Sequence, residues 1–357
     1  MSEPDPPVNP PRSHRGRGAG SNPRNRFEVL DVIYDPEADP GSPPTELLRD
    51  SSDSILARND SPDVPFEFSL NPYRGCEHGC SYCYARPTHE YLGLSAGLDF
   101  ETKILVKEKA PELLEKALSS RSWRPQVIAF SGVTDPYQPI ERRLRLTRRC
   151  LEVLVAFCNP VGVVTKSFLV TRDVDLLVQL AEKNAASVLL SVTTLDVDLA
   201  RHLEPRAAHP SRRLAAIERL AEAGIPVGVS VAPVIPGLTD HEIPAILKAA
   251  ANAGATFGGY MILRLPHGVK ELFDDWLKRH RPDRRRRVLQ RIRDLRAGGL
   301  NDTEFGRRMR GTGAYADQIQ QLFDTSRRRA GLARRSPELS TASFRRPGGT
   351  QLSLFSE

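Results

Sequence analysis

Three cysteines stand within eight residues of this chain, in the segment NPYRGCEHGCSYCYAR that covers residues 71–86. Their spacing is C-x3-C-x2-C, with the thiols at Cys76, Cys80 and Cys83. Thiolates are the usual protein ligands of iron–sulfur clusters. Three of them can bind three irons of a [4Fe–4S] cube and leave the fourth iron without a protein ligand. An iron with an open position can bind a small molecule and act on it, so the segment predicts an enzyme.

A structural zinc site is one alternative for these thiols. Such a site normally needs four closed ligands, and His78 or His89 would have to supply the fourth. The usual zinc pattern is two separated cysteine pairs, and no second C-x2-C occurs in the sequence. The spacing therefore favours an iron–sulfur cluster over zinc.

A disulfide framework fits less well, because the chain has five cysteines in 357 residues and begins with no apolar signal-peptide core. We therefore expect a cytoplasmic protein in a reducing environment. The other two cysteines, Cys150 and Cys158, lie in an expected helix with Leu151, Leu154 and Phe157. We expect them to pack there as small apolar side chains.

The cysteine segment resembles the signature of the radical S-adenosylmethionine (SAM) superfamily, in which an aromatic residue precedes the last cysteine. Tyr82 fills that position. The longer string NPYRGC-x2-GC-x-YCYAR is similar to the branch related to spore photoproduct lyase, and the similarity runs from about Phe66 to Arg296. The resemblance implies a [4Fe–4S] cluster on the three cysteines, with SAM chelating the open iron. It also implies an electron donor such as flavodoxin or ferredoxin, reductive cleavage of SAM, and a 5′-deoxyadenosyl radical that abstracts a substrate hydrogen.

Strands that alternate with helices are expected after the cysteine segment. Short runs rich in β-branched residues predict strands at 127–130, 161–165, 187–193, 226–232 and 258–263. Amphipathic stretches lie between them, and this alternation implies a parallel sheet with right-handed crossovers. With a strand ahead of Cys76 there are about six βα units, fewer than the eight of a closed barrel. The expected fold class is α/β, a partial (β/α)6 TIM-like barrel, which the family resemblance also implies.

Functional side chains of such a barrel gather at the carboxyl ends of its strands. The turn 131–138 follows the second strand, where radical SAM proteins carry a Gly-rich segment that contacts the methionyl amine. No GGE string occurs in this turn, and Asp135 and Gln138 are the candidates for the amine. Lys166 follows the third strand, where a lysine can pair with the SAM carboxylate. Tyr82 is a further candidate contact of SAM.

Further candidates follow the fourth strand. Ser191 and Thr193 end it and are expected to hydrogen-bond the ribose or carboxylate of SAM. Glu204 and Arg206 lie just beyond, where a paired Glu and Arg would border the pocket. Each of these side chains has an ordinary alternative, a strand-end or turn residue bonded to its own backbone. The sequence assigns no residue a catalytic role.

One position departs from spore photoproduct lyase, which places a cysteine at the end of its second strand as hydrogen donor to the product radical. This chain has Ser131 and Gly132 in that region. Thymine-dimer reversal is therefore not expected, and the reaction type stays open. DNA or another nucleic acid is the favoured substrate, and radical modification of RNA or a protein is the alternative. An alternative of another class is a nucleic-acid-binding protein with a structural or redox-sensing cluster.

Composition divides the chain into four regions. Residues 1–60 are rich in Pro, Gly, Ser, Asp and Arg and predict a largely disordered basic arm, and 61–270 form the barrel. An Arg-rich helical appendage is expected at 271–327, followed by a disordered tail at 328–357. The segment from Arg279 to Arg296 contains nine arginines and two aspartates. Its net charge of +7 equals the net charge of the whole chain. This amphipathic helix suits phosphate contacts with a nucleic acid, and its alternative is a solvated helix face.

The end of the chain carries a short motif of its own. The residues from Gln351 to Phe355, QLSLF, resemble the pentapeptide by which bacterial replication and repair proteins bind the sliding clamp. A flexible tether would present these apolar side chains to a preformed pocket. The alternative is an apolar chain end that folds back on the barrel. No run of eighteen apolar residues occurs, so no membrane span is expected.

Overall fold

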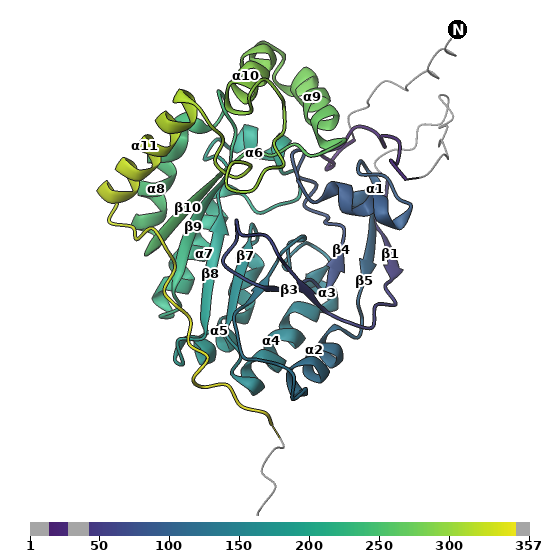
Figure 1. Ribbon diagram of the computed structural model, residues 1–357, viewed down its shortest axis with the longest axis vertical. Coiled ribbons are helices and arrows are strands. Elements are labelled where there is room, and N and C mark those ends of the chain that lie inside the picture. Colours follow the sequence, from purple (N-terminus) through teal and green to yellow (C-terminus); the bar gives the residue numbers. More distant parts are fainter. Residues whose placement is uncertain (1–13, 28–42, 348–357) are drawn as a thin grey trace, which may run out of the picture.

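The computed structural model describes residues 14–27 and 43–347 of the chain. Parallel strands lie side by side at its centre (Figure 1). Their order is β10 (Phe257–Ile262), β9 (Val227–Val234), β8 (Ala186–Ser191), β7 (Val161–Thr165), β6 (Ile128–Phe130) and β3 (Phe68–Leu70). At one edge β2 (Leu56–Arg58) pairs antiparallel with β3, and β10 forms the other edge. The expected α/β partial barrel with six parallel strands is confirmed.

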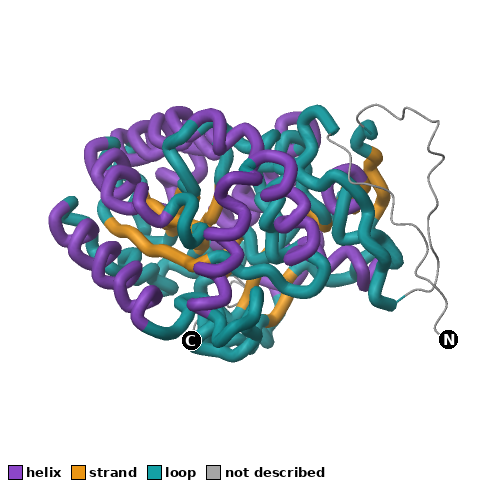
Figure 2. The backbone as a smooth tube through the Cα atoms, turned by 90° about the horizontal axis from the view of Figure 1, so that it is seen from above, coloured by secondary structure: helices purple, strands orange, loops and turns teal. Residues whose placement is uncertain are grey.

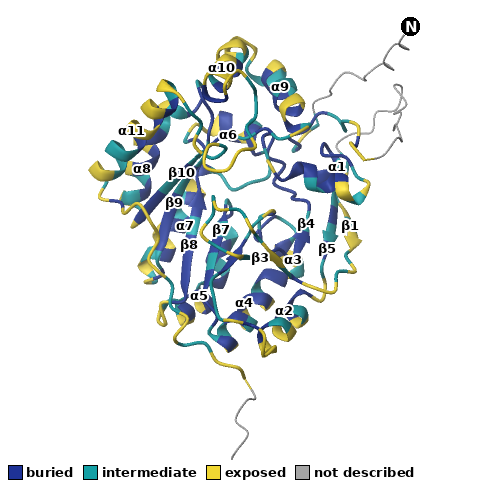
Figure 3. Ribbon diagram, in the orientation of Figure 1, coloured by how far each residue is buried: buried dark blue, intermediate teal, exposed yellow. Residues whose placement is uncertain are grey.

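Helices connect the strands and lie around them (Figures 1 and 2). The longer connecting helices are α2 (Ala110–Ser119), α4 (Leu146–Phe157), α5 (Val174–Ala181), α7 (Pro210–Glu222) and α8 (Ile243–Asn252). The shorter ones are α1 (Asp99–Thr102), α3 (Glu141–Leu144) and α6 (Val197–Leu203), with 3-10 segments η1 (Arg86–Leu92), η2 (Phe168–Asp173) and η3 (Asp240–Glu242). Each longer helix turns an apolar stripe inward, as α4 does with Cys150, Leu151 and Leu154, all fully buried. The central parallel strands are mostly buried, whereas β2 at the edge is largely exposed (Figure 3).

A second, smaller sheet supports the cysteine segment, and the sequence did not predict it. Its strands are β1 (Glu46–Arg49), β5 (Lys103–Val106) and β4 (Tyr73–Arg74). The central strand β5 pairs parallel with β1 and antiparallel with β4. Because β4 leads directly into Cys76, this sheet fixes where the cysteine segment begins.

The described parts of the N-terminal arm are packed against the body, so the expectation of a disordered arm at 1–60 is wrong for residues 14–27 and 43–60. A Cβ added at Gly18 would lie 1.8 Å from the carbonyl oxygen of Gly79, inside the cysteine segment. The Arg17 guanidinium donates to the carbonyl of Glu101 over 3.0 Å. These contacts use glycines, backbone groups and a polar side chain, which show no hydrophobic period in the sequence.

Three helices form the C-terminal appendage: α9 (Val269–His280), α10 (Pro282–Leu295) and α11 (Ala314–Arg329). The first two pack together, and α11 lies along α8 on the outside of the barrel (Figure 1). Residues 330–347 then run along the barrel, where the Arg345 amide donates to the Phe157 carbonyl over 2.9 Å. The expectation of a disordered tail from 328 is therefore wrong as far as 347.

The motif from Gln351 to Phe355 lies outside the described residues. Within the described ranges, no helix is both long and apolar enough to cross a membrane.

Candidate active site

The cysteine segment between β4 and η1 folds over the carboxyl ends of the central strands. Cys76 and Cys80 are buried, Cys83 is half-buried, and all three are free thiols. The Cys76 amide donates to Phe100 over 2.9 Å. The Ser81 amide donates to Leu203 over 2.9 Å, which ties the middle of the segment to α6.

Arg86, the last residue of the motif, holds the segment from inside. It is fully buried, and its Nε and Nη2 both donate to the Cys80 carbonyl, over 3.0 and 2.8 Å. The same guanidinium pairs with the buried carboxylate of Glu101. Glu101 also accepts the amides of Gly18 and Ala19, over 3.0 and 2.8 Å. One buried ion pair thus joins the cysteine segment to the N-terminal arm.

Asn71, the first residue of the motif, shapes the turn after β6. Its Oδ1 accepts the backbone amides of Gly132, Val133 and Thr134, over 3.1, 3.0 and 3.3 Å. Gln138, later in the same turn, spans the start of the cysteine segment. Its Oε1 accepts the Glu77 amide over 2.9 Å, and its Nε2 donates to the Gly75 carbonyl over 3.2 Å.

The three thiols fit the donor set of a [4Fe–4S] cluster with one open iron. They lie close enough for Cys76 and Cys83 to raise the pKa of Cys80 further, beyond the larger effect of burial. Burial raises the pKa of Cys83 to about 11, and Arg86 opposes that rise. Binding of a cationic centre would favour the thiolates.

The zinc alternative finds no support in the geometry. Among the described residues, no group of three or more His, Cys, Asp or Glu side chains meets as ligands of one metal ion. A cluster has no such requirement, since each thiolate binds a different iron. Of the two histidines considered, the His78 ring pairs with Asp135 at 3.4 Å, and the His89 Nε2 lies 2.9 Å from the Lys103 carbonyl.

A buried polar network lies beneath the cysteine segment, at the ends of β7 and β8. Its centre is the carboxylate of Glu204, which accepts hydrogen bonds from the Tyr82 hydroxyl and, over 2.7 Å, from the Thr193 hydroxyl. The Lys166 ammonium lies 3.7 Å from the same carboxylate, and Arg213 forms a fully buried ion pair with it. Although burial alone would raise the pKa of Glu204, Arg213 and Lys166 hold it at about 2.

Asp135 connects this network to the turn after β6. Its side chain is 10% exposed, and its Oδ1 accepts the Thr165 hydroxyl over 2.7 Å. Its Oδ2 accepts the Lys166 amide over 2.8 Å. Burial alone would raise the pKa of Asp135, but His78 and these hydrogen bonds lower it. The carboxylate is therefore an anion next to the cysteine segment.

The structure brings most of the sequence candidates together and separates two of them. Residues that gather around the network are Tyr82, Asp135, Lys166, Ser191 and Thr193. Gln138 instead hydrogen-bonds the cysteine segment through both its amide oxygen and its amide nitrogen. Arg206 pairs with Glu77 at 3.1 Å and donates to Thr45 over 3.2 Å.

The expected pair of Glu204 with Arg206 is therefore wrong, because Arg213 of α7 takes the place of Arg206. Besides its ion pair with Glu204, Arg213 donates to the Ser191 carbonyl over 3.0 Å. The sequence reasoning missed this residue. The available signal was its place in the buried stripe of α7, which also contains Ile217 and Leu220. An arginine in an apolar stripe needs a buried partner.

The two remaining cysteines lie away from the carboxyl ends of the strands. Cys150 is fully buried in the core on α4, as expected, and Cys158 follows the end of that helix. Ser131 occupies the end of β6, in the left-handed region with φ of 100°. Among the described residues, no cysteine outside the motif lies at the mouth of the barrel.

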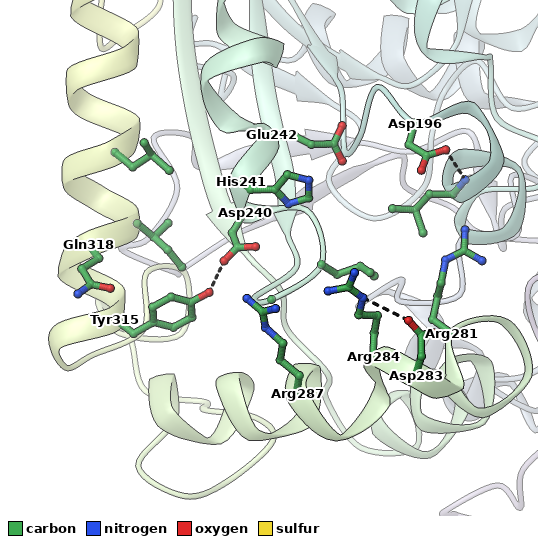
Figure 4. A pocket seen from close by; sticks show the side chains of 15 residues that line it. Asp196, Asp240, His241, Glu242, Arg281, Asp283, Arg284, Arg287, Tyr315 and Gln318 are labelled. Atoms are coloured by element: carbon green, nitrogen blue, oxygen red, sulfur yellow. Dashed lines mark hydrogen bonds and ion pairs between the residues drawn. The ribbon is translucent and has the colours of Figure 1, made fainter.

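A cavity of about 880 Å³ lies beside this site (Figure 4). It is bounded by η3, α10, α11 and the start of α6, and none of the SAM candidates lines it. Leu199 lines the cavity and also packs in the apolar cluster that contains Cys80 and Tyr82. Leu199 therefore links the cavity wall to the apolar cluster that holds the cysteine segment.

Comparison with known proteins gives consistent results. Residues 70–250 match the family model of the radical SAM superfamily. An uncharacterized protein of Mycobacterium tuberculosis strain H37Rv is 38% identical over 234 residues, which cover 65% of this chain and 68% of that protein. A radical SAM Nα-GlyT isomerase of Pseudomonas phage M6 is 28% identical over 174 residues, 48% of this chain and 34% of the isomerase.

Among solved structures, spore photoproduct lyase complexed with dinucleoside spore photoproduct has a similar fold. The TM-score is 0.59 over 80% of both chains, with 17% sequence identity.

Proposed function

Because the chain belongs to the radical SAM superfamily of enzymes, which bind a [4Fe–4S] cluster and SAM, we propose that it cleaves SAM reductively to abstract a hydrogen atom from a nucleic acid. In this proposal Cys76, Cys80 and Cys83 hold the cluster, which supplies an electron when reduced by a donor such as flavodoxin or ferredoxin. The observation that carries the proposal is the position of three free thiols, two buried and one half-buried, next to a charged network at the strand ends.

Lys166 is the residue we assign to the SAM carboxylate. Its ammonium has three donors, and the described contacts are a 3.2 Å hydrogen bond to the Ala232 carbonyl and a 3.7 Å ion pair with Glu204. A donor therefore remains for a ligand. We assign Asp135 to the methionyl amine, and the hydroxyls of Ser191 and Thr193 to the remaining polar atoms of SAM, in exchange for their present partners. Gln138 and Arg206 hold the cysteine segment in this account and support SAM indirectly.

The arginine face of α10 supports a nucleic-acid substrate. Arg284, Arg286 and Arg287 are exposed; Arg284 pairs with the neighbouring Asp283 at 3.3 Å, and Arg285 pairs with Asp274 at 2.6 Å. In Figure 4 the Arg284 and Arg287 side chains point into the cavity. Glu242, another acid of that cavity, accepts the Leu195 amide over 2.7 Å. Exposed guanidinium groups on one helix face suit phosphate contacts.

One similar structure points in the same direction, because the lyase of similar fold is complexed with a dinucleoside photoproduct. Radical modification of RNA or a protein is the alternative within enzymes. The binding of the segment from Gln351 to Phe355 to a sliding clamp stays a prediction from the sequence motif, because that segment lies outside the described residues.

Isotope transfer tests the substrate class. Anaerobically reconstituted protein is incubated with SAM, dithionite and DNA that carries deuterium on its sugar and base carbons. We expect deuterium in the 5′-deoxyadenosine, because hydrogen abstraction moves the label from DNA to that product. Transfer from deuterated RNA or protein but not from DNA would replace DNA by the alternative substrates. SAM that stays intact, with a cluster signal indifferent to SAM, would support a structural or redox-sensing cluster.

A further inference from the structure

Arg264 follows β10 at the mouth of the barrel, and its position is fixed by its neighbours. Leu263 and Leu265 on either side are buried. Both pack in the apolar cluster that contains Cys80 and Tyr82. The backbone that carries Arg264 is therefore part of the wall of the candidate active site, and the arginine side chain is held at its rim.

The guanidinium of Arg264 has no oxygen partner within residues 14–27 and 43–347. Its Nε is enclosed and unbonded, and its Nη1 reaches only the thioether of Met309, over 3.8 Å. A thioether is a weak acceptor. Other arginines with an unbonded buried Nε differ in this respect. Each of them donates to a backbone carbonyl through another nitrogen: Arg279 to Gly18, Arg296 to Leu263 and Arg327 to Leu332.

The acid near Arg264 is already engaged. Asp63 forms an ion pair with Arg308, and its other oxygen accepts the Gly306 amide over 2.6 Å. Burial lowers the pKa of Arg264, and Arg308 lowers it further. A cation removed from water without an anion is costly, so a half-buried guanidinium without an oxygen partner indicates a missing anionic group.

Tyr84 shows where that anion would lie. The Arg264 guanidinium stands 5.5 Å from the centre of the Tyr84 ring, and Tyr84 directly follows Cys83. The Tyr84 hydroxyl donates to the Gly132 carbonyl over 3.0 Å, in the turn after β6. Arg264 and Tyr84 therefore span the mouth from β10 to β6. Tyr84 itself is 43% exposed, so a ligand can reach its side chain from solvent.

We propose that Arg264 binds a phosphate group of the nucleic-acid substrate at the mouth of the barrel. This inference rests on the proposed function, because it takes the substrate to be a nucleic acid. A guanidinium offers a planar pair of donors that matches two phosphate oxygens. Bound there, the phosphate would bring its nucleotide over Tyr84, next to the cysteine segment. Arg264 would then select substrates that carry a phosphate and position them.

The test compares three forms of the full-length reconstituted protein: the parent, Arg264→Gln and a matched control, Arg212→Gln. Arg212 also stands over an aromatic ring, 3.5 Å from the centre of Phe168, but on α7. The probe is a fluorescein-labelled single-stranded DNA, titrated by fluorescence anisotropy at several salt concentrations. Equilibrium dialysis with labelled SAM is run on the same samples.

We expect Arg264→Gln to weaken DNA binding about tenfold or more, since it removes a charge-assisted contact. The slope of log affinity against log salt should fall by about 0.7, the value for one single-strand phosphate. The control should bind DNA as the parent does. Equal affinity and slope for parent and Arg264→Gln would overturn the inference while leaving the proposed function in place.

Two further outcomes are distinguishable. A loss of SAM affinity in Arg264→Gln with unchanged DNA binding would assign the anion to the SAM carboxylate and overturn the inference. Parent protein that binds no DNA, and transfers no deuterium from it, would overturn the proposed substrate and this inference together.

Discussion

The hydroxyl of Tyr82 donates a hydrogen bond to the buried carboxylate of Glu204. This contact links the residue before the last cysteine of the motif to the turn between α6 and α7. Because Glu204 is also bonded to Arg213 and Thr193, the cysteine segment is tied to the strand ends by a network that water does not reach. The position of the thiols over the strands is therefore set by buried polar contacts as well as by packing.

Loss of the charge on Glu204 should destabilise the protein. In Glu204→Gln the Arg213 guanidinium stays buried beside a neutral group, and we expect the free energy of unfolding to fall by about 3 kcal/mol. Glu218→Gln is the control, because Glu218 is exposed on the same α7. It should change stability by less than about 0.5 kcal/mol. Urea unfolding under anaerobic conditions measures both, and equal losses would contradict the role given to the network.

Lys166 should matter for SAM more than for stability. We expect Lys166→Met to lower SAM affinity by about tenfold or more, because a charge-assisted contact with the carboxylate is lost. Lys166→Arg should retain part of the affinity. Lys183→Met, at an exposed position after α5, is the control and should bind SAM like the parent. Equilibrium dialysis with labelled SAM gives the comparison; unchanged affinity in Lys166→Met would remove this residue from the site.

The central sheet could be predicted because its strands are buried on both faces and read as continuous apolar runs. The expected strand 161–165 is β7 itself, and the other four expected strands differ from β6, β8, β9 and β10 by one or two residues at their ends. Strand-end residues such as Lys166 followed from that prediction. The sequence did not predict which polar side chains, distant along the chain, pair with one another.

Arg213, for example, pairs with Glu204 from α7. The apolar spacing of that helix indicated only that it packs against the sheet. The N-terminal arm was missed for another reason. Its contacts are made by backbone amides such as those of Gly18 and Ala19 and by polar side chains such as Arg17, so no apolar pattern records them.

The arm should protect the cysteine segment. A Cβ at Gly18 would lie 1.8 Å from the Gly79 carbonyl, so Gly18→Ala must displace the arm from its contacts with Glu101. We expect the reconstituted protein to lose its visible cluster absorbance faster in air and to be destabilised by about 1–3 kcal/mol. Gly259→Ala is the control, because a Cβ at Gly259 meets nothing within 4 Å. Identical bleaching rates in both variants would show that the arm does not shield the cluster.

Acid should destabilise the fold through His89. Burial lowers the pKa of His89 to about 4, so the ring is neutral in the folded state, whereas the unfolded chain protonates it near pH 6.5. The unfolded state therefore binds more protons below that value, and stability falls as the pH drops from 6.5 towards 4. At pH 5.5 the loss relative to pH 8 should be about 1 kcal/mol from this group. His89→Phe should reduce the pH dependence of urea unfolding, and an unchanged dependence would contradict the assignment.

The measurement that tests the central claim most directly is 5′-deoxyadenosine formation by anaerobically reconstituted protein with SAM and dithionite, compared with Cys83→Ala. The account predicts 5′-deoxyadenosine from the parent and none from the variant, because the three thiols of the motif must hold the cluster together. Product from neither protein, with a cluster spectrum in the parent that does not respond to SAM, would contradict it.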